Sequence, residues 1–320
     1  MFTRLAAIST ALALTFPNGG VPLRTCAAQP EASETSETPL LVTSGWLKGH
    51  LHDKNLVLLH VGDPREFDKA HLPGARNATL RDFSDPDMAG NGGLMLQMPA
   101  SEVLREKLQA LGISNNSQIV IYAAQQWFSP ATRVLLTMDY VGLGDRAVLL
   151  DGGLEGWTKA GGPVETGASA TPSRGSLTAL NIRPFIVDAA YVNAHIGKPG
   201  FSIVDGRDRV FYDGVSVGGG RAAPMPPHLK GHIASAKSLP FSEIWTDTSF
   251  AKSPAEIREL FAKAGVAPTD TVIAYCHIGQ QATSVVFGAR LIGQPVLFYD
   301  GSFEDWSKQP NARVEVPAKP

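Results

Sequence analysis

The sequence contains an internal repeat, in which five short motifs occur twice in the same order. The matching pairs are 42–47 with 187–192, 56–62 with 201–207, 70–75 with 231–236, 119–122 with 272–275, and 150–157 with 299–306. A chain of 320 residues is long enough for two ordinary domains. The repeat therefore predicts two tandem copies of one folding unit, at residues 40–166 and 185–317.

Short apolar runs alternate with amphipathic stretches within each copy. The apolar runs are typical of strands buried in a parallel sheet. Residues 254–264 illustrate the helical pattern, because Ser253 can cap a helix, Pro254 suits its first position, and Ile257 and Phe261 share one face. Thr43 and Asp188 are candidate caps in the two copies. The alternation predicts an α/β fold, with a parallel sheet flanked by helices in each copy.

Two segments carry loop signals instead. Residues 165–174 are rich in Gly, Ala, Ser, Thr and Pro, which predicts a linker over 167–184 between the copies. The second copy has extra residues at 214–227, and this Gly- and Pro-rich insertion is expected to form an irregular surface loop.

The first 28 residues have the pattern of a signal peptide. Arg4 precedes an apolar run at 5–16, and small residues follow at 25–28. This run is too short to span a bilayer, so we expect an exported protein, periplasmic in a Gram-negative bacterium, with no membrane attachment after cleavage. A lipid anchor at Cys26 is disfavoured, because Arg24 stands where such signals need a small residue. The alternative is a buried N-terminal helix.

Cleavage would leave Cys276 as the single cysteine, so no internal disulfide can form. A lone cysteine in an oxidising compartment is either an inert core residue or a thiol with a function. The formal net charge of −2 predicts no nucleic-acid or membrane partner. The sequence has no metal-ligand spacing and no nucleotide or flavin motif, so no cofactor is expected.

Cys276 ends the apolar run 272–275, and a short loop containing Gly279 leads from it into a predicted helix. In parallel sheets, sites form at the carboxyl ends of strands. This order of strand, loop and helix aims backbone N–H groups and a helix N-terminus at the sulfur, and both favour the thiolate over the thiol. Cys276 is therefore the candidate nucleophile.

These motifs together resemble the two-domain rhodanese family of sulfurtransferases. Both copies carry a His-Ile/Leu-x-Gly/Ser-Ala turn and a closing Asp-Gly-(Gly/Ser)-x-x-x-Trp, and only the second has a strand that ends in cysteine. The resemblance covers residues 40–317 and implies an inactive first domain and a catalytic second one. Ala123 stands where the second copy has Cys276, and Gly62 where it has Arg207.

The resemblance implies a double displacement. Cys276 would take a sulfane sulfur from a small anionic donor, either thiosulfate or 3-mercaptopyruvate, and pass it from a persulfide to cyanide or a thiol. The substrate-binding candidates are Arg207, His277, Ile278, Gly279, Gln280 and Gln281. Backbone N–H groups of this loop would form a cup around the sulfur, and Gly279 would allow its turn.

Several of these roles have alternatives. Arg207 can grip an anion with two donors, or form a structural ion pair with Asp205 or Glu243, and Arg209 is a weaker candidate for the anion. His277 can stabilise the thiolate, bind the donor or face solvent. Gln280 and Gln281 can donate to an anion or be solvated.

Both copies keep the closing Asp and Trp, as Asp151 and Trp157 in the first copy and as Asp300 and Trp306 in the second. Because the first copy lacks the nucleophile, we interpret these four residues as scaffold.

The loop after Cys276 matches neither the basic pattern of thiosulfate enzymes nor the small-residue pattern of mercaptopyruvate enzymes. Thiosulfate is the first choice, because His277 and Arg207 can supply positive charge. A phosphatase is disfavoured, since residues 281–284 contain no arginine to clamp phosphate. The remaining alternatives are a non-catalytic persulfide carrier or binding module in the cell envelope, and a purely structural protein.

Overall fold

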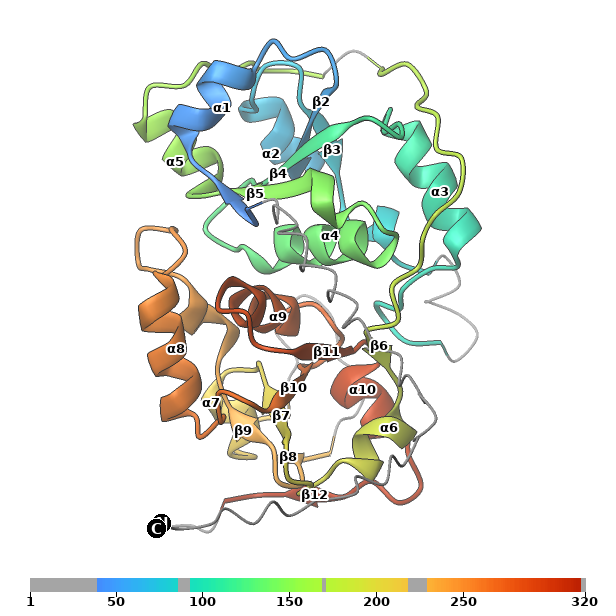
Figure 1. The fold of residues 1–320 in the computed structure, drawn as a ribbon, viewed down its shortest axis with the longest axis vertical. Helices are drawn as coiled ribbons and strands as arrows, with labels where there is room; N and C mark the ends of the chain where they lie inside the picture. The colour runs from blue at the N-terminus through green and yellow to red at the C-terminus, as the bar shows by residue number, and fades with distance from the viewer. Residues whose placement is uncertain (1–38, 86–92, 169–170, 218–228, 318–320) are drawn as a thin grey trace, which may run out of the picture. The chain divides into compact units, whose positions relative to one another are not determined.

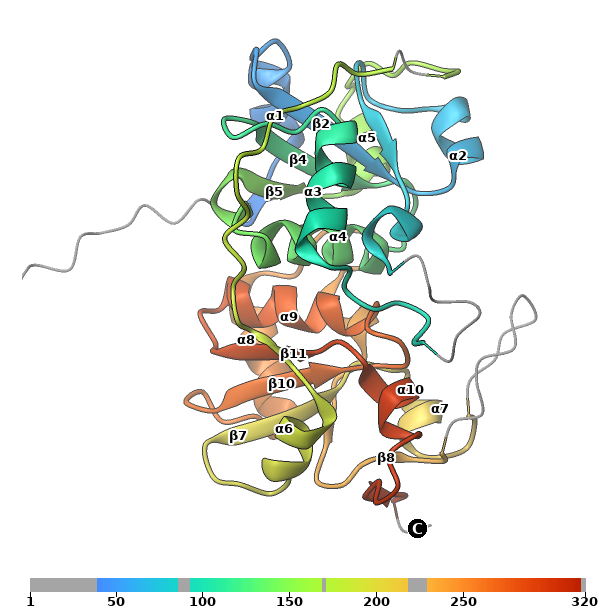
Figure 2. The ribbon, with the colours of Figure 1, turned by 90° about the vertical axis from the view of Figure 1, so that its right-hand side faces the viewer.

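The computed structural model describes residues 39–85, 93–168, 171–217 and 229–317. These residues belong to one compact unit, Glu37–Pro320, which contains both copies of the repeat (Figures 1 and 2). The predicted signal peptide and residues 218–227 of the predicted surface loop lie outside the described residues. Within the described ranges, no helix is long and apolar enough to cross a membrane.

The first copy is built on a parallel five-stranded sheet of order β1-β5-β4-β2-β3. Its strands are β1 (Leu41–Val42), β2 (Leu56–Val61), β3 (Arg76–Ala78), β4 (Gln118–Ala123) and β5 (Ala147–Leu150). Its helices are α1 (Ser44–His50), α2 (Pro64–Lys69), α3 (Ser101–Ala110), α4 (Ser129–Tyr140) and α5 (Gly153–Lys159), with short 3-10 turns at Leu80–Phe83 and Gly144–Arg146.

The second copy repeats this topology in the sheet β6-β11-β10-β7-β9, again parallel. Its strands are β6 (Ile186–Val187), β7 (Phe201–Asp205), β9 (Lys237–Ser238), β10 (Thr271–Tyr275) and β11 (Val296–Tyr299). Its helices are α6 (Ala189–Ala194), α7 (Arg209–Tyr212), α8 (Pro254–Lys263), α9 (Ala282–Leu291) and α10 (Ser302–Trp306), with a 3-10 turn at Phe241–Ile244. A small antiparallel pair joins β8 (His232–Ile233) to β12 (Val314–Glu315). The predicted α/β fold with two tandem copies is confirmed.

The predicted helix caps are confirmed as well. The hydroxyl of Thr43 accepts a hydrogen bond from the backbone of Trp46, and the Asp188 carboxylate accepts one from Tyr191. Ser253 caps α8 in a reciprocal arrangement with Glu256, whose carboxylate accepts from the Ser253 backbone. Each cap satisfies a helix N–H that would otherwise lack an intrahelical partner.

Helices α4 and α9 lie side by side between the two sheets (Figures 1 and 2). Both are buried around most of their circumference, as expected for helices covered on all sides. One hydrophobic cluster runs from strands of the first copy through these helices to strands of the second. The two copies therefore share one core, in addition to a hydrophobic cluster that each copy forms from its own residues.

The segment between α5 and β6 contains no helix or strand in its described residues, 160–168 and 171–185, apart from a single bridge between Glu165 and His71. This agrees in kind with the expected linker. The boundaries 40–166, 167–184 and 185–317 stay a prediction.

Candidate active site

Cys276 lies one residue beyond the end of the central strand β10, and its side chain is fully buried. Its backbone N–H donates to the hydroxyl of Ser302 at 3.1 Å, and its carbonyl accepts from Phe303 at 3.0 Å. The loop that follows ends at Gln281, which caps α9. The N-terminus of α10 thus anchors the cysteine backbone, and the predicted order of strand, loop and helix is present.

The loop after Cys276 presents a run of backbone donors. The N–H groups of Ile278, Gly279, Gln280 and Gln281 donate to no acceptor among the described residues. Gly279 has φ +80°, and a Cβ there would lie 2.5 Å from the carbonyl oxygen of Asp300. A glycine is thus required at this turn. Consecutive backbone N–H groups of this kind can hold an anion.

The loop side chains differ in what they can offer a ligand. The side-chain amide of Gln280 donates to the hydroxyl of Ser129 in the first copy at 2.9 Å, and the backbone carbonyl of Gln280 accepts from the hydroxyl of Thr283. The side-chain oxygen of Gln281 is buried without a hydrogen-bond partner among the described residues. Ile278 is half-buried. The Gln280 amide nitrogen has two N–H donors and this bond uses one of them, so the predicted donation to an anion would have to come from the other.

His277 is buried, so the interpretation that it faces solvent is wrong. Its ring meets the ring of Phe211 edge to face, with centroids 4.5 Å apart. Phe211 belongs to α7, the short helix that also carries Arg209. This contact brings the helix after β7 against the loop that carries the candidate nucleophile.

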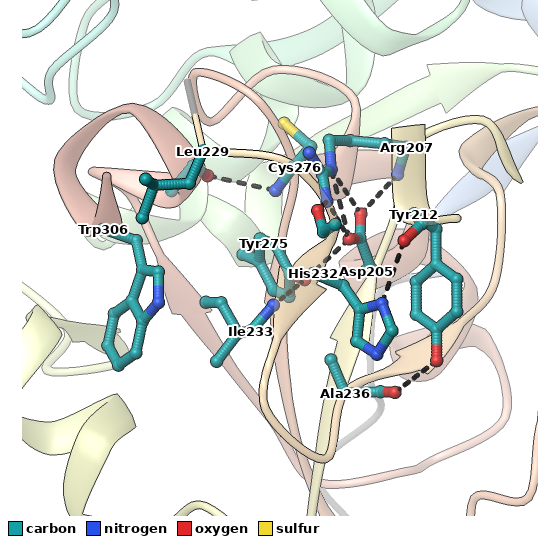
Figure 3. A network of polar contacts seen from close by, with 12 residues as sticks. Asp205, Arg207, Tyr212, Leu229, His232, Ile233, Ala236, Tyr275, Cys276 and Trp306 are labelled. Atoms are coloured by element: carbon teal, nitrogen blue, oxygen red, sulfur yellow. Dashed lines mark hydrogen bonds and ion pairs between the residues drawn. The ribbon is translucent and has the colours of Figure 1, made fainter. Parts of the chain in front are cut away.

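Arg207 forms a buried ion pair with Asp205, beside Cys276 (Figure 3). Its Nε donates to Asp205 Oδ1 at 2.9 Å, its Nη2 to Asp205 Oδ2 at 2.5 Å, and Nη2 also to the carbonyl of Gly231. Burial lowers the pKa of Arg207, but the charge and hydrogen bonds of Asp205, with smaller contributions from Tyr275 and Cys276, raise the pKa overall. Asp205, not Glu243, is thus the partner, and Arg207 keeps its positive charge.

This geometry changes the order of the two arginine candidates. Arg207 is 1% exposed and much of its guanidinium is committed to Asp205, whereas the side chain of Arg209 is 70% exposed. Among the described residues, Arg209 is held by Asp213 at 3.6 Å and by the ring of Tyr212. Arg209, expected to be the weaker candidate, is the one available to a ligand in solution.

The first copy lacks this arrangement. His60 pairs in register with Tyr122 as Asp205 pairs with Tyr275. Its Nδ1 lies 3.3 Å from the Tyr122 hydroxyl, and burial, with a contribution from His71, lowers its pKa to about 4. A neutral histidine therefore stands in place of the carboxylate. A Cβ at Gly62 would lie 2.5 Å from that of Ala124, so an arginine has no room there.

Arg133 is the residue of this site that the sequence did not reveal. It comes from α4 of the first copy and is fully buried, yet its Nη1 donates to the carbonyl of Gly279 at 3.0 Å and to Asp300 Oδ1 at 2.5 Å. The sequence signal was a single charge among the first nine residues of what is now seen as α4. Asp300, interpreted as scaffold of its own copy, instead joins the two copies.

Comparisons with known proteins match both copies of the repeat. The model of the rhodanese-like domain matches residues 43–160 and 188–309. A probable 3-mercaptopyruvate sulfurtransferase of Pseudomonas aeruginosa is 30% identical over 293 residues, covering 86% of this chain and 97% of the relative. The human 3-mercaptopyruvate sulfurtransferase is 31% identical, covering 76% and 78%, and the thiosulfate sulfurtransferase of Cricetulus griseus is 28% identical, covering 78% and 82%.

Solved structures share the fold. The anaerobic ergothioneine biosynthesis enzyme from Chlorobium limicola superposes with a TM-score of 0.74 at 21% identity, covering 88% of this chain and 71% of that one. At this identity the likeness concerns the fold alone.

Proposed function

This chain belongs to the rhodanese family of sulfurtransferases, and from that premise we propose that it transfers a sulfane sulfur through a persulfide on Cys276. The donor is a small anion, thiosulfate or 3-mercaptopyruvate, and the acceptor is a thiol or cyanide. The observation that carries the proposal is a buried cysteine at a strand end, the one cysteine in the part of the chain that the structure describes, followed by four backbone N–H groups that have no acceptor among the described residues.

The reaction splits into two displacements. The Cys276 thiolate attacks the outer sulfur of thiosulfate, the sulfur–sulfur bond breaks, and sulfite leaves with the bonding electrons. The enzyme then carries a persulfide. Cyanide or a thiolate attacks the terminal sulfur, forms thiocyanate or a new persulfide, and returns Cys276 as a thiolate.

The residues around Cys276 would act mainly through electrostatics. The N–H groups of residues 278–281 would stabilise the negative charge of the thiolate and of the persulfide. Arg207 lies beside Cys276, and its buried ion pair with Asp205 places a fixed dipole there. In this proposal the donor itself meets Arg209, which is exposed on α7.

Thiosulfate remains the preferred donor in this proposal. A dianion benefits most from the exposed positive charge of Arg209. The relatives include a probable 3-mercaptopyruvate sulfurtransferase and a thiosulfate sulfurtransferase, so activity with the two donors has to be compared directly.

We also propose that residues 1–28 direct export. Sequencing the N-terminus of the protein from the cell envelope tests this, since an intact Met1 would contradict it.

The test is thiocyanate formation from thiosulfate and cyanide by the wild type and by Cys276→Ala. We expect turnover in the wild type and none in the variant. Turnover that survives in Cys276→Ala would overturn the assignment of the nucleophile. A wild type inactive with thiosulfate but active with 3-mercaptopyruvate would change the donor, and inactivity with both would favour a persulfide carrier.

A further inference from the structure

Arg133 is a charged residue in the most buried helix of the first copy. It is 0% exposed, although its helix α4 belongs to the copy that has no nucleophile. A buried arginine needs a counter-charge and acceptors for its donors. The counter-charge comes from Asp300 of the second copy, and one acceptor is the Gly279 carbonyl in the loop that follows Cys276.

The contacts of Arg133 converge on that loop. One nitrogen, Nη1, donates to the carbonyl of Gly279 at 3.0 Å and to Asp300 Oδ1 at 2.5 Å. Nη2 lies 3.4 Å from the carbonyl of Leu96, and the guanidinium carbon lies 5.4 Å from the centre of the Phe298 ring. The side chain is therefore fixed on several sides before it meets Gly279.

Both carboxylate oxygens of Asp300 accept hydrogen bonds from the first copy. Its Oδ2 accepts from the backbone of Met98 at 2.6 Å, while Oδ1 accepts from Arg133. Glu304, four residues on, accepts from the backbone of Met95 at 2.9 Å and donates its own N–H to the carbonyl of His277. The first copy thus contacts the α10 turn and the loop at the same place.

The contact with Gly279 has a consequence for the next residue. A peptide unit is planar and trans, so the carbonyl of one residue and the N–H of the next point in opposite directions. By holding the Gly279 carbonyl, Arg133 fixes the N–H of Gln280 to point away from itself. That N–H is one of the four without an acceptor among the described residues.

We propose that Arg133 is a positioning residue for the sulfur-transfer reaction, supplied by the copy that has no nucleophile. It holds the Gly279–Gln280 peptide so that the loop donors face the sulfur of Cys276. The proposal rests on the function proposed above, and it gives the first copy a direct part in the active site.

The test compares Arg133→Met with a matched control, Arg290→Met. Arg290 lies on α9 and pairs with Asp139 of α4 at 2.5 Å, so this pair also joins the two copies through an arginine and an aspartate. Among the described residues, Arg290 forms this ion pair and lies over the ring of Phe185, and it makes no hydrogen bond or ion pair with residues 276–281. Loss of Arg290 therefore reports the effect of breaking a bridge between the copies without touching the loop.

Two readouts are measured on each variant. The first is sulfite release in a single turnover with thiosulfate, which we expect to fall about 100-fold in Arg133→Met, since small misplacements of reacting groups can cost this much. The second is the pH dependence of Cys276 alkylation by iodoacetamide, which we expect to move to higher pH. Arg290→Met should change sulfite release by no more than about threefold and leave the alkylation profile in place.

A folded Arg133→Met that keeps both the rate and the alkylation profile would overturn the proposal, and so would an equal loss in Arg290→Met. If Arg133→Met does not fold, Arg133→Lys takes its place, because it keeps a charge opposite Asp300 but loses the planar fork of donors. The same shift in alkylation is expected there. Alkylation needs no sulfur donor, so it decides the role of Arg133 even if the wild type transfers no sulfur.

Discussion

Thr132 and Thr283 each follow an alanine near the beginning of the helix after their copy's central strand, and their hydroxyls hydrogen-bond to each other at 2.7 Å. A residue that contacts its own counterpart marks a local twofold relation between the copies, as in an isologous dimer. A second pair of contacts follows the same relation. Asp151 of the first copy accepts from the backbone of Ala251 in the second, while Asp300 of the second accepts from Met98 in the first.

These contacts explain why a copy without a nucleophile persists in one compact unit. The shared hydrophobic cluster buries apolar surface that either copy alone would expose to water. At the edge of this interface the two copies differ. Arg133 contacts the loop after Cys276, whereas its counterpart in the second copy, Ser284, bears no charge.

We predict that Asp205→Asn destabilises the protein strongly. Removing the carboxylate leaves the charge of Arg207 buried without a counter-ion, which typically costs about 3–5 kcal/mol. Asp213→Asn is the control, because it breaks only the pair with Arg209, whose side chain is 70% exposed, and should cost less than about 1 kcal/mol. Urea unfolding of both variants measures the two losses, and similar small values would refute a structural role for the Asp205–Arg207 pair.

We predict that Arg209→Gln weakens donor binding without loss of stability. The side chain is exposed, so its removal should leave the free energy of unfolding within about 0.5 kcal/mol of the wild type. The KM for thiosulfate should rise about tenfold, since a charge-assisted contact contributes roughly 1.5 kcal/mol, while the KM for cyanide changes less. An unchanged KM for thiosulfate would remove Arg209 from the donor site.

The contrast between the two arginines marks a limit of sequence reasoning. The pattern of Asp205 and Arg207 fits both anion capture and a structural ion pair, and only the burial of both side chains distinguishes them. By contrast, the repeat and the apolar runs were sufficient to predict both sheets and the position of Cys276, because a strand, a loop and a capped helix are local patterns.

The role of Arg133 could not be predicted from the sequence for another reason. Its partner Gly279 is 146 residues away in the chain, and the contact exists only because α4 packs on α9. Burial of His277 was missed similarly, since the helix that covers it, α7, follows a different strand. Contacts between elements distant in sequence leave no periodicity that a single sequence could display.

We predict that Gly279→Ala impairs activity more than stability alone would explain. The added Cβ would lie 2.5 Å from the carbonyl oxygen of Asp300, at a φ of +80° that side chains disfavour. Gly161→Ala is the control, since it has φ +70° and no atom within 4 Å of an added Cβ. Gly161→Ala should lose about 1–2 kcal/mol of stability from its φ alone, and Gly279→Ala should lose more because of the close carbonyl oxygen. With both variants measured where they are folded, only Gly279→Ala should lose about tenfold or more in kcat. Equal kcat values in the two variants would argue against the loop geometry proposed here.

We predict that His60 makes the protein less stable in acid. Burial, with a contribution from His71, lowers the pKa of this histidine from 6.5 to about 4. Between these two pH values the imidazole is therefore mostly protonated in the unfolded chain and mostly neutral in the folded one. The stability associated with neutral His60 is thus fully present above about pH 6.5 and is lost as pH falls towards 4, amounting to roughly 3 kcal/mol. Replacing the imidazole by an amide that does not titrate, in His60→Gln, should remove this part of the pH dependence.

Urea unfolding of the wild type and of His60→Gln at about pH 7 and about pH 4 measures the effect. Other titrating groups contribute to both proteins, so the comparison uses the difference between the two losses. We expect the wild type to lose roughly 3 kcal/mol more than the variant over this range. If both proteins lose the same free energy of unfolding between the two pH values, His60 binds its proton in the folded state as readily as in the unfolded state. The first copy would then hold a positive charge at the position where the second copy holds the Asp205 carboxylate.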